Sequence, residues 1–132
     1  MGAIRAGSLV LDFGCGAGFD MYVVSLLTGE KAMTYGVDLT EKMVQRARVN
    51  LTCAGLTNFE IRRVDSENLP YADSFFDVVI SNGVINLSPC KQQCFREIYR
   101  VLKPGGVLRF ADVVLETELP PHMTGSPEAW SH

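Results

Sequence analysis

The strongest constraint on the fold is a run of alternating glycines that follows a short apolar segment. The segment Leu9–Phe13 is apolar except for Asp12, and Gly14, Gly16 and Gly18 come directly after it. Glycine is favoured where φ is positive or where a ligand lies against bare backbone. An apolar stretch of helical character follows, and the amides at the start of a helix can donate to a ligand. The pattern predicts a strand, a sharp turn and a helix, with a small-molecule pocket at the carboxyl end of the strand.

Strands and helices are expected to alternate along the rest of the chain. The expected strands are residues 9–13, 33–37, 58–64, 76–81 and 107–114, and the expected helices are residues 18–27, 40–54 and 88–102. Repeated units of this size predict a doubly wound α/β fold, in which a mostly parallel, Rossmann-like sheet of about five strands carries helices on both faces.

Local signals predict where these helices end and which faces they bury. Thr40 is expected to cap the second helix, Gly29 to end the first helix in the left-handed conformation, and Gly55 to close the second. The inner face expected for the second helix is Met43, Ala47, Leu51 and Ala54, with Val44 beside them. The inner face expected for the third helix is Phe95, Ile98, Tyr99 and Leu102.

The length, charge and apolar content of the chain argue against several classes of protein. The chain has 132 residues, 47% of them hydrophobic, and a formal net charge of −3. This is enough for one core, which we expect over residues 1–115, with an irregular C-terminal extension over residues 116–132. The mild acidity argues against a nucleic-acid partner. No apolar run approaches the roughly 20 residues that cross a bilayer, and no signal-like segment opens the sequence, so we expect a cytoplasmic protein without a membrane partner.

Four cysteines raise the question of disulfides or a metal. Cys15 lies in the glycine turn, Cys53 late in a helix, and Cys90 and Cys94 four residues apart on another helix. Structural zinc requires four ligands, and both histidines lie in the tail, so no metal centre is expected. Reduced, unligated thiols are the favoured interpretation. A soft-ion or redox pair of Cys90 and Cys94 is the alternative.

Three acidic residues, Asp12, Asp38 and Asp65, stand at or just beyond the ends of expected strands. Asp38 follows the glycines by about 20 residues, the spacing at which an acid accepts hydrogen bonds from ribose hydroxyls. The alternative for Asp38 is an electrostatic partner for the helix that begins at Thr40. The alternative for Asp65 is a local cap of the turn that follows it.

The glycine spacing distinguishes between classes of ligand. A dinucleotide site has the pattern Gly-x-Gly-x-x-Gly, whereas this chain has Gly-x-Gly-x-Gly with Phe19 next. Asp12, two residues before the first glycine, would repel a pyrophosphate. The same acid suits a ligand with a positive amino or sulfonium group. A nicotinamide-dependent oxidoreductase is therefore disfavoured.

Several motifs together resemble the class I S-adenosylmethionine-dependent methyltransferases. They are residues 12–18, 36–38, Asp65, 77–82 and 102–106, in family order and across nearly all of residues 8–115. Within that family, the segments 18–20, 36–40, 81–89 and 112–114 are similar to the arsenite methyltransferase branch. The resemblance implies a class I core that lacks the last strands of the family's sheet.

The resemblance also implies a set of cofactor-binding positions. They are Asp12, Gly14, Gly16, Gly18, Asp38, Leu39, Asp65, Ser66, Ser81 and Asn82. In that scheme the glycines and Asp12 hold the methionine portion of S-adenosylmethionine, Asp38 the ribose, and Leu39 and Asp65 with Ser66 the adenine. Ser81 and Asn82 line the floor beside the transferred methyl. No catalytic side chain is assigned, because the sulfonium is already activated and the protein mainly aligns the reactants.

Two departures from the family pattern affect the expected function. Gly83 stands where arsenite methyltransferases carry a metalloid-binding cysteine, so arsenite is not the expected acceptor. The missing last strands leave the fifth strand at an edge, which either a second copy or the C-terminal tail would cover, and we expect a homo-oligomer through that edge. We expect an S-adenosylmethionine-dependent methyltransferase acting on a small molecule. The alternative is a non-catalytic module that binds S-adenosylmethionine or S-adenosylhomocysteine and needs a partner subunit.

Overall fold

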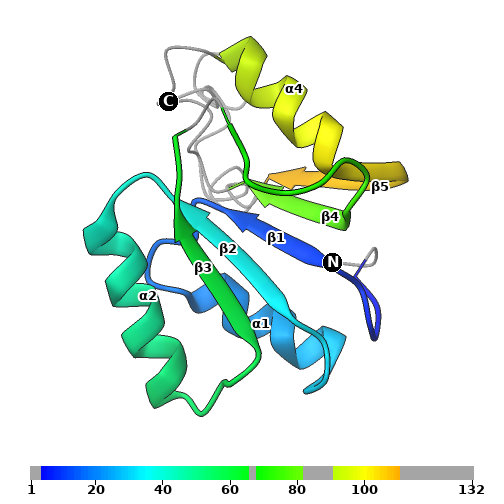
Figure 1. The fold of residues 1–132 in the computed structure, drawn as a ribbon. Coiled ribbons are helices and arrows are strands. Elements are labelled where there is room, and N and C mark those ends of the chain that lie inside the picture. Colours follow the sequence, from blue (N-terminus) through cyan, green and yellow to red (C-terminus); the bar gives the residue numbers. More distant parts are fainter. Residues whose placement is uncertain (1–3, 66–67, 82–90, 111–132) are drawn as a thin grey trace, which may run out of the picture.

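A computed structural model describes residues 4–65, 68–81 and 91–110. The described elements follow the expected order, in which strands and helices alternate except that β4 follows β3 directly (Figure 1). They are β1 (Val10–Phe13), α1 (Phe19–Thr28), β2 (Thr34–Asp38), α2 (Glu41–Cys53), β3 (Phe59–Arg63), β4 (Phe76–Ser81), α4 (Lys91–Val101) and β5 (Leu102–Phe110). The expectations for the start of the third helix at residue 88, for residues 111–114 of the last strand and for the C-terminal extension lie outside the described residues.

The strands form one parallel sheet of five strands in the order β3-β2-β1-β4-β5. The chain winds outward from β1 to β3 and then crosses to β4 on the other side of β1. The sequence-based prediction of a doubly wound parallel sheet is confirmed. Ligands bind such sheets at the carboxyl ends of the strands, where the direction of winding reverses. Here that point lies beside the carboxyl end of β1, where the glycine turn begins.

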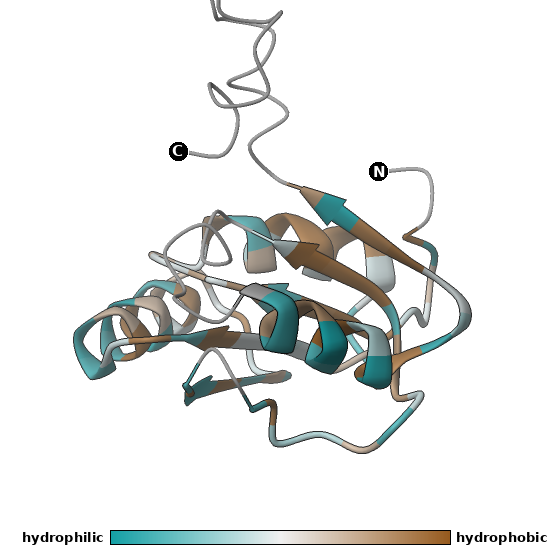
Figure 2. Cartoon of the chain, turned by 90° about the horizontal axis from the view of Figure 1, so that it is seen from above, coloured by the Kyte–Doolittle hydropathy of each residue, from teal (hydrophilic) through white to brown (hydrophobic). Residues whose placement is uncertain are grey.

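Helices cover both faces of the sheet, with one apolar cluster on the α4 side and two on the side of α1 and α2 (Figure 1). On one face, Val10 of β1 packs in a cluster with Val24 of α1. On the other face, Leu11 of β1 packs with Ile98 of α4. Figure 2 shows the brown, hydrophobic strands lying between helices on either side. Successive β1 residues thus serve opposite faces, as the two-residue period of a strand requires.

Helix α2 begins where the sequence predicts. The amide of Met43 donates to the Thr40 hydroxyl at 3.2 Å, which is the N-cap hydrogen bond. The buried face of α2 is Val44, Ala47 and Leu51. The expected inner face was therefore partly wrong, because Met43 is only half-buried and Ala54 is exposed at the helix end.

The inner face of α4 also differs from the prediction. Phe95 is 40% exposed and Tyr99 is 83% exposed, whereas Ile98 is buried together with Cys94 and Val101. The apolar residues of this helix form one wide stripe, and the predicted face lay toward the Phe95 and Tyr99 edge of that stripe. Contact with the sheet selects the face of Cys94, Ile98 and Val101.

Two glycine-containing connections were also predicted incompletely. Gly29 has φ 98° and ψ 161°, so it ends α1 with positive φ but outside the left-handed helical region. Residues 103–106, expected to be a break, belong to β5. A side chain at Gly106 would place its Cβ 2.8 Å from the Lys103 carbonyl oxygen and 3.1 Å from that of Asp77.

In the described part of the chain, no helix is both long enough and apolar enough to cross a membrane.

Candidate functional site

The glycine turn after β1 is built on positive φ angles. Gly14, Gly16 and Gly18 have φ of 89°, 52° and 90°. The amides of Gly14 and Cys15 donate to the Val37 carbonyl of β2 at 2.8 and 3.0 Å, and the amide of Gly18 donates to the Cys15 carbonyl at 2.8 Å. The predicted need for glycine at these three positions is confirmed, because other residues rarely adopt this conformation.

The three glycines do not all leave the same space. Among the described residues, a Cβ at Gly16 would meet only the terminal methyl of Met43, at 3.8 Å, so these residues leave that part of the turn open to a ligand. A Cβ at Gly18 would lie 3.2 Å from Leu51 Cγ and 3.4 Å from the Ala47 carbonyl. Gly18 therefore lets α1 begin close against α2, a packing role that the sequence pattern did not distinguish from ligand contact.

Asp38 joins the end of β2 to the glycine turn. Its Oδ2 accepts a hydrogen bond from the amide of Gly16 at 2.9 Å, and its Oδ1 accepts one from the amide of Leu39 at 2.7 Å. The hydrogen-bonding cap of α2 comes from Thr40, so any contribution of Asp38 to that helix would be electrostatic. The carboxylate is only 9% exposed and lies beside the open backbone of Gly16.

Negative charge collects around this turn. Asp12 on β1 is 1% exposed and Cys15 is 5% exposed. Burial, followed by the charges of Asp12 and Asp38, raises the pKa of the Cys15 thiol to about 12. The thiol is therefore protonated at neutral pH and is no nucleophile. The charges of Asp12 and Asp38, which add to the effect of burial on the thiol, would attract a cationic ligand.

The other predicted site residues lie at neighbouring strand ends. Asp65 is exposed just beyond β3, which pairs with β2. Its carbonyl accepts a hydrogen bond from the Asn68 amide at 3.3 Å. Leu39 is half-buried against the α4-side cluster. Ser66 lies outside the described residues.

Ser81 ends β4 opposite Phe13 of β1. It is 1% exposed, and in the described segments its hydroxyl oxygen has no hydrogen-bond partner. A buried hydroxyl at the carboxyl edge is suited to receive a polar group of a ligand. Asn82, the next predicted position, lies outside the described residues.

Met43 is a residue of this region that the sequence pattern assigned to the core. Its terminal methyl faces the bare side of Gly16, and it lies in the first turn of α2, close after Asp38 and Leu39. The signal that could have identified it was this short distance in sequence from the acid.

Within residues 4–65, 68–81 and 91–110, no three His, Cys, Asp or Glu side chains gather as a metal site.

Comparison with known proteins shows similarity to methyltransferases. A family described as a methyltransferase domain matches residues 4–132. The arsenite methyltransferase of Halobacterium salinarum is 40% identical over 127 residues, covering 96% of this chain and 32% of that protein. The ubiquinone/menaquinone biosynthesis C-methyltransferase UbiE of Klebsiella pneumoniae is 36% identical over 118 residues, covering 86% of this chain and 47% of that protein.

A solved structure is similar over the same region. The crystal structure of CrArsM, an arsenic(III) S-adenosylmethionine methyltransferase from Chlamydomonas reinhardtii, has a TM-score of 0.74 and 41% sequence identity. The similarity covers 82% of this chain and 39% of that one. The chain spans less than half the length of each of these three relatives.

Proposed function

The chain belongs to the methyltransferase domain family, and on that premise we propose that it binds S-adenosylmethionine and transfers the methyl group to a small-molecule acceptor. The observation that carries this proposal is the hydrogen bond between Asp38 and the amide of Gly16. It brings an acid from the end of β2 to the open face of the glycine turn. A nucleoside ligand can there meet a carboxylate and bare backbone at once.

The chain's own residues would hold the ligand along the carboxyl edge of the sheet. Gly16, with open space above its Cα, admits the methionine portion, and the buried Asp12 orients the turn. Asp38 accepts from the ribose hydroxyls, with Leu39 against the adenine. The remaining proposed positions are Gly14, Gly18, Asp65, Ser66, Ser81 and Asn82.

The charge of this region supports a sulfonium ligand over a dinucleotide. Asp12 and Asp38 both raise the pKa of the Cys15 thiol, so both charges reach the inside of the turn. S-adenosylmethionine supplies a methyl group already activated by its positive sulfur. The protein's task is then to bind that sulfur nucleoside and to align an acceptor with it.

The acceptor is proposed only as a small molecule. The relatives carry different names, one for arsenite methylation and another for C-methylation in ubiquinone and menaquinone biosynthesis. Gly83, where a metalloid-binding cysteine would stand in the arsenite methyltransferases, lies outside the described residues. Arsenite therefore belongs in an acceptor panel as one test compound among thiols, phenols and quinols.

Calorimetry and turnover test the proposal in two steps. We expect S-adenosylmethionine and S-adenosylhomocysteine to bind and NADH not to bind. Binding of NADH alone would overturn the assignment. Release of S-adenosylhomocysteine in the presence of an acceptor would establish catalysis, whereas no turnover across the panel would favour the non-catalytic binding module.

Three broader expectations remain proposals. We propose a cytoplasmic protein with a core over residues 1–115 and an extension over 116–132. Among the described strands β5 lies at an edge, and an unpaired edge is a template for another strand. A homo-oligomer through β5 is the proposed outcome, and a monodisperse monomer in multi-angle light scattering would refute it.

A further inference from the structure

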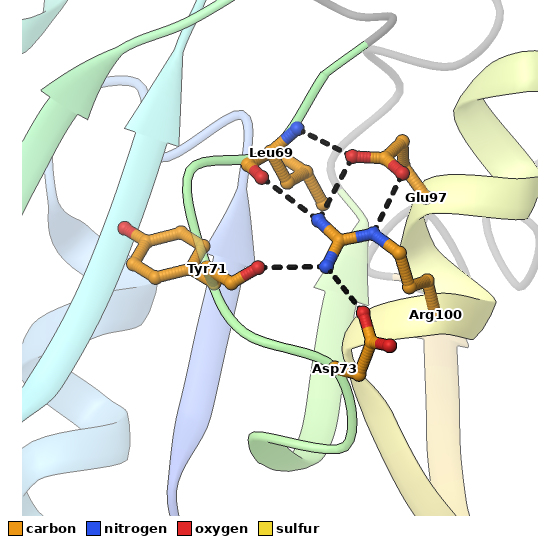
Figure 3. A network of polar contacts seen from close by, with 5 residues as sticks. All are labelled: Leu69, Tyr71, Asp73, Glu97 and Arg100. Atoms are coloured by element: carbon orange, nitrogen blue, oxygen red, sulfur yellow. Dashed lines mark hydrogen bonds and ion pairs between the residues drawn. The ribbon is translucent and has the colours of Figure 1, made fainter.

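Arg100 of α4 is the centre of a polar network that holds the connection between β3 and β4 (Figure 3). Its guanidinium donates to the carboxylate of Glu97 at 2.8 and 3.0 Å and to Asp73 at 2.8 Å. It also donates to the carbonyls of Tyr71 at 2.8 Å and Leu69 at 2.9 Å. Glu97 in turn accepts from the amide of Leu69 at 2.8 Å.

The less exposed part of this network is the pair of Arg100 and Glu97. Their side chains are 32% and 13% exposed, whereas that of Asp73 is 77% exposed. The hydrogen bond between the two side chains is the main cause of both pKa shifts: it lowers the pKa of Glu97 and raises the pKa of Arg100. Both groups therefore stay charged near neutral pH. An exposed pair such as Arg100 with Asp73 contributes little by comparison.

The network holds Leu69, four residues after Asp65. On the other side of Asp65, the sheet holds Val64, whose amide donates to the Asp38 carbonyl at 2.9 Å. Between these two anchors, the Asn68 amide closes on the Asp65 carbonyl. The position of Asp65 thus depends on Val64 on one side and on Leu69, held by Glu97 and Arg100, on the other.

Helix α4 itself does not depend on this network for its place on the sheet. Cys94, Ile98 and Val101 are buried in the apolar cluster with β1 and β4. The later part of the connection has its own backbone anchors, since the amide of Phe75 donates to the Val101 carbonyl at 2.8 Å. The Arg100 side chain therefore acts mainly on the earlier part of the connection between β3 and β4, and not on the place of α4 on the sheet.

We propose that Arg100 and Glu97 are positioning residues that hold Asp65 in place to recognise the amino group of the adenine ring. This inference rests on the proposed function, in which Asp65 binds the adenine. Arginine suits the role because its planar fork satisfies two carbonyls and two carboxylates at once, a geometry that lysine cannot reproduce.

The test compares two ligands in matched variants. S-adenosylhomocysteine carries the adenine amino group, and its deaminated analogue S-inosylhomocysteine lacks it. Calorimetry on the wild-type chain, Arg100→Lys and Glu97→Gln measures the ratio of the two dissociation constants. Lys103→Gln is the control, since it breaks a partly exposed ion pair with Asp77, 3.2 Å long, between β4 and β5.

We expect Arg100→Lys to reduce the preference for the amino-bearing ligand by about tenfold, the range of one lost hydrogen bond to a charged group. Glu97→Gln should reduce it less, because the amide keeps one acceptor for Leu69, and Lys103→Gln should leave the ratio unchanged. In an Asp65→Ala background, Arg100→Lys should have no further effect on the ratio. A purely stabilising role would lower the melting temperature and leave the ratio as in the wild type.

The outcomes separate the inference from the proposed function. Failure of the wild-type chain to bind S-adenosylhomocysteine would refute the proposed function. Binding by the wild type with an unchanged ligand ratio in Arg100→Lys and Glu97→Gln would refute the positioning role alone. Additive effects of Arg100→Lys and Asp65→Ala would refute it equally. If Arg100→Lys fails to fold, the Glu97→Gln ratio decides.

Discussion

Replacing Asp38 by alanine tests both the local structure and the proposed ligand contact. The substitution removes the acceptors for the amides of Gly16 and Leu39. A hydrogen bond to a charged group contributes about 1.5–3 kcal/mol. Because water can replace part of the lost interaction at the half-buried Leu39, we expect the free energy of unfolding to fall by about 2–3 kcal/mol. Asp38→Asn, which keeps one acceptor, should cost roughly half as much.

The same substitution should weaken ligand binding. Losing the acceptor for two ribose hydroxyls should raise the dissociation constant of S-adenosylhomocysteine by about 30- to 150-fold, equivalent to about 2–3 kcal/mol. Urea denaturation and calorimetry measure the two effects separately. Glu60→Gln is the control, because it loses only an exposed pair with Arg62 on the edge strand β3. An unchanged unfolding free energy refutes the anchoring role of Asp38, and an unchanged dissociation constant refutes the ribose contact.

Three further substitutions test the packing and charge of the site. Gly36→Ala would overlap the sulfur of the fully buried Met21, so we expect a loss of about 1–3 kcal/mol in urea denaturation, and wild-type stability would contradict this. Ser81→Ala should leave stability unchanged, since in the described segments its hydroxyl has no partner, but should weaken S-adenosylhomocysteine binding in calorimetry; equal affinity would remove Ser81 from the site. Burial raises the pKa of the Cys15 thiol in the folded protein to about 12, above its ordinary value of 9.0. The protonated thiol therefore contributes fully to stability below pH 9, and this contribution is lost as the pH rises toward 12. The free energy of unfolding should be lower at pH 10.5 than at pH 8.5, and this difference should be smaller by about 1–2 kcal/mol in Cys15→Ala. Equal differences in the two proteins would contradict the burial effect.

Much of the fold could be read from short stretches of sequence, because their signals are local. Positive φ at Gly14, Gly16 and Gly18, the cap at Thr40 and the bounds of β4 each depend on residues that are neighbours in the chain. Alternation of such stretches was enough to predict a parallel α/β sheet. The roles of the individual site residues, the location in the cell and the oligomeric state remain predictions.

Pairings between distant segments required the tertiary structure. The pattern around residue 38 left open whether that acid serves a ligand or a helix, and the structure adds a third partner, the amide of Gly16, 22 residues away in sequence. It also shows that Gly18 faces α2 and that Arg100 holds the segment after Asp65.

The sequence by itself determined the order of elements, the glycine turn after β1 and the class of sheet, since φ angles, caps and apolar periods act over a few residues. Only the tertiary structure decided which face of α4 is buried and what each polar side chain meets. Ile98 is buried whereas Tyr99, one residue away and equally apolar in pattern, is 83% exposed. The physical reason is that burial and hydrogen bonding depend on the surface that another element presents, and that surface exists only once the sheet has formed.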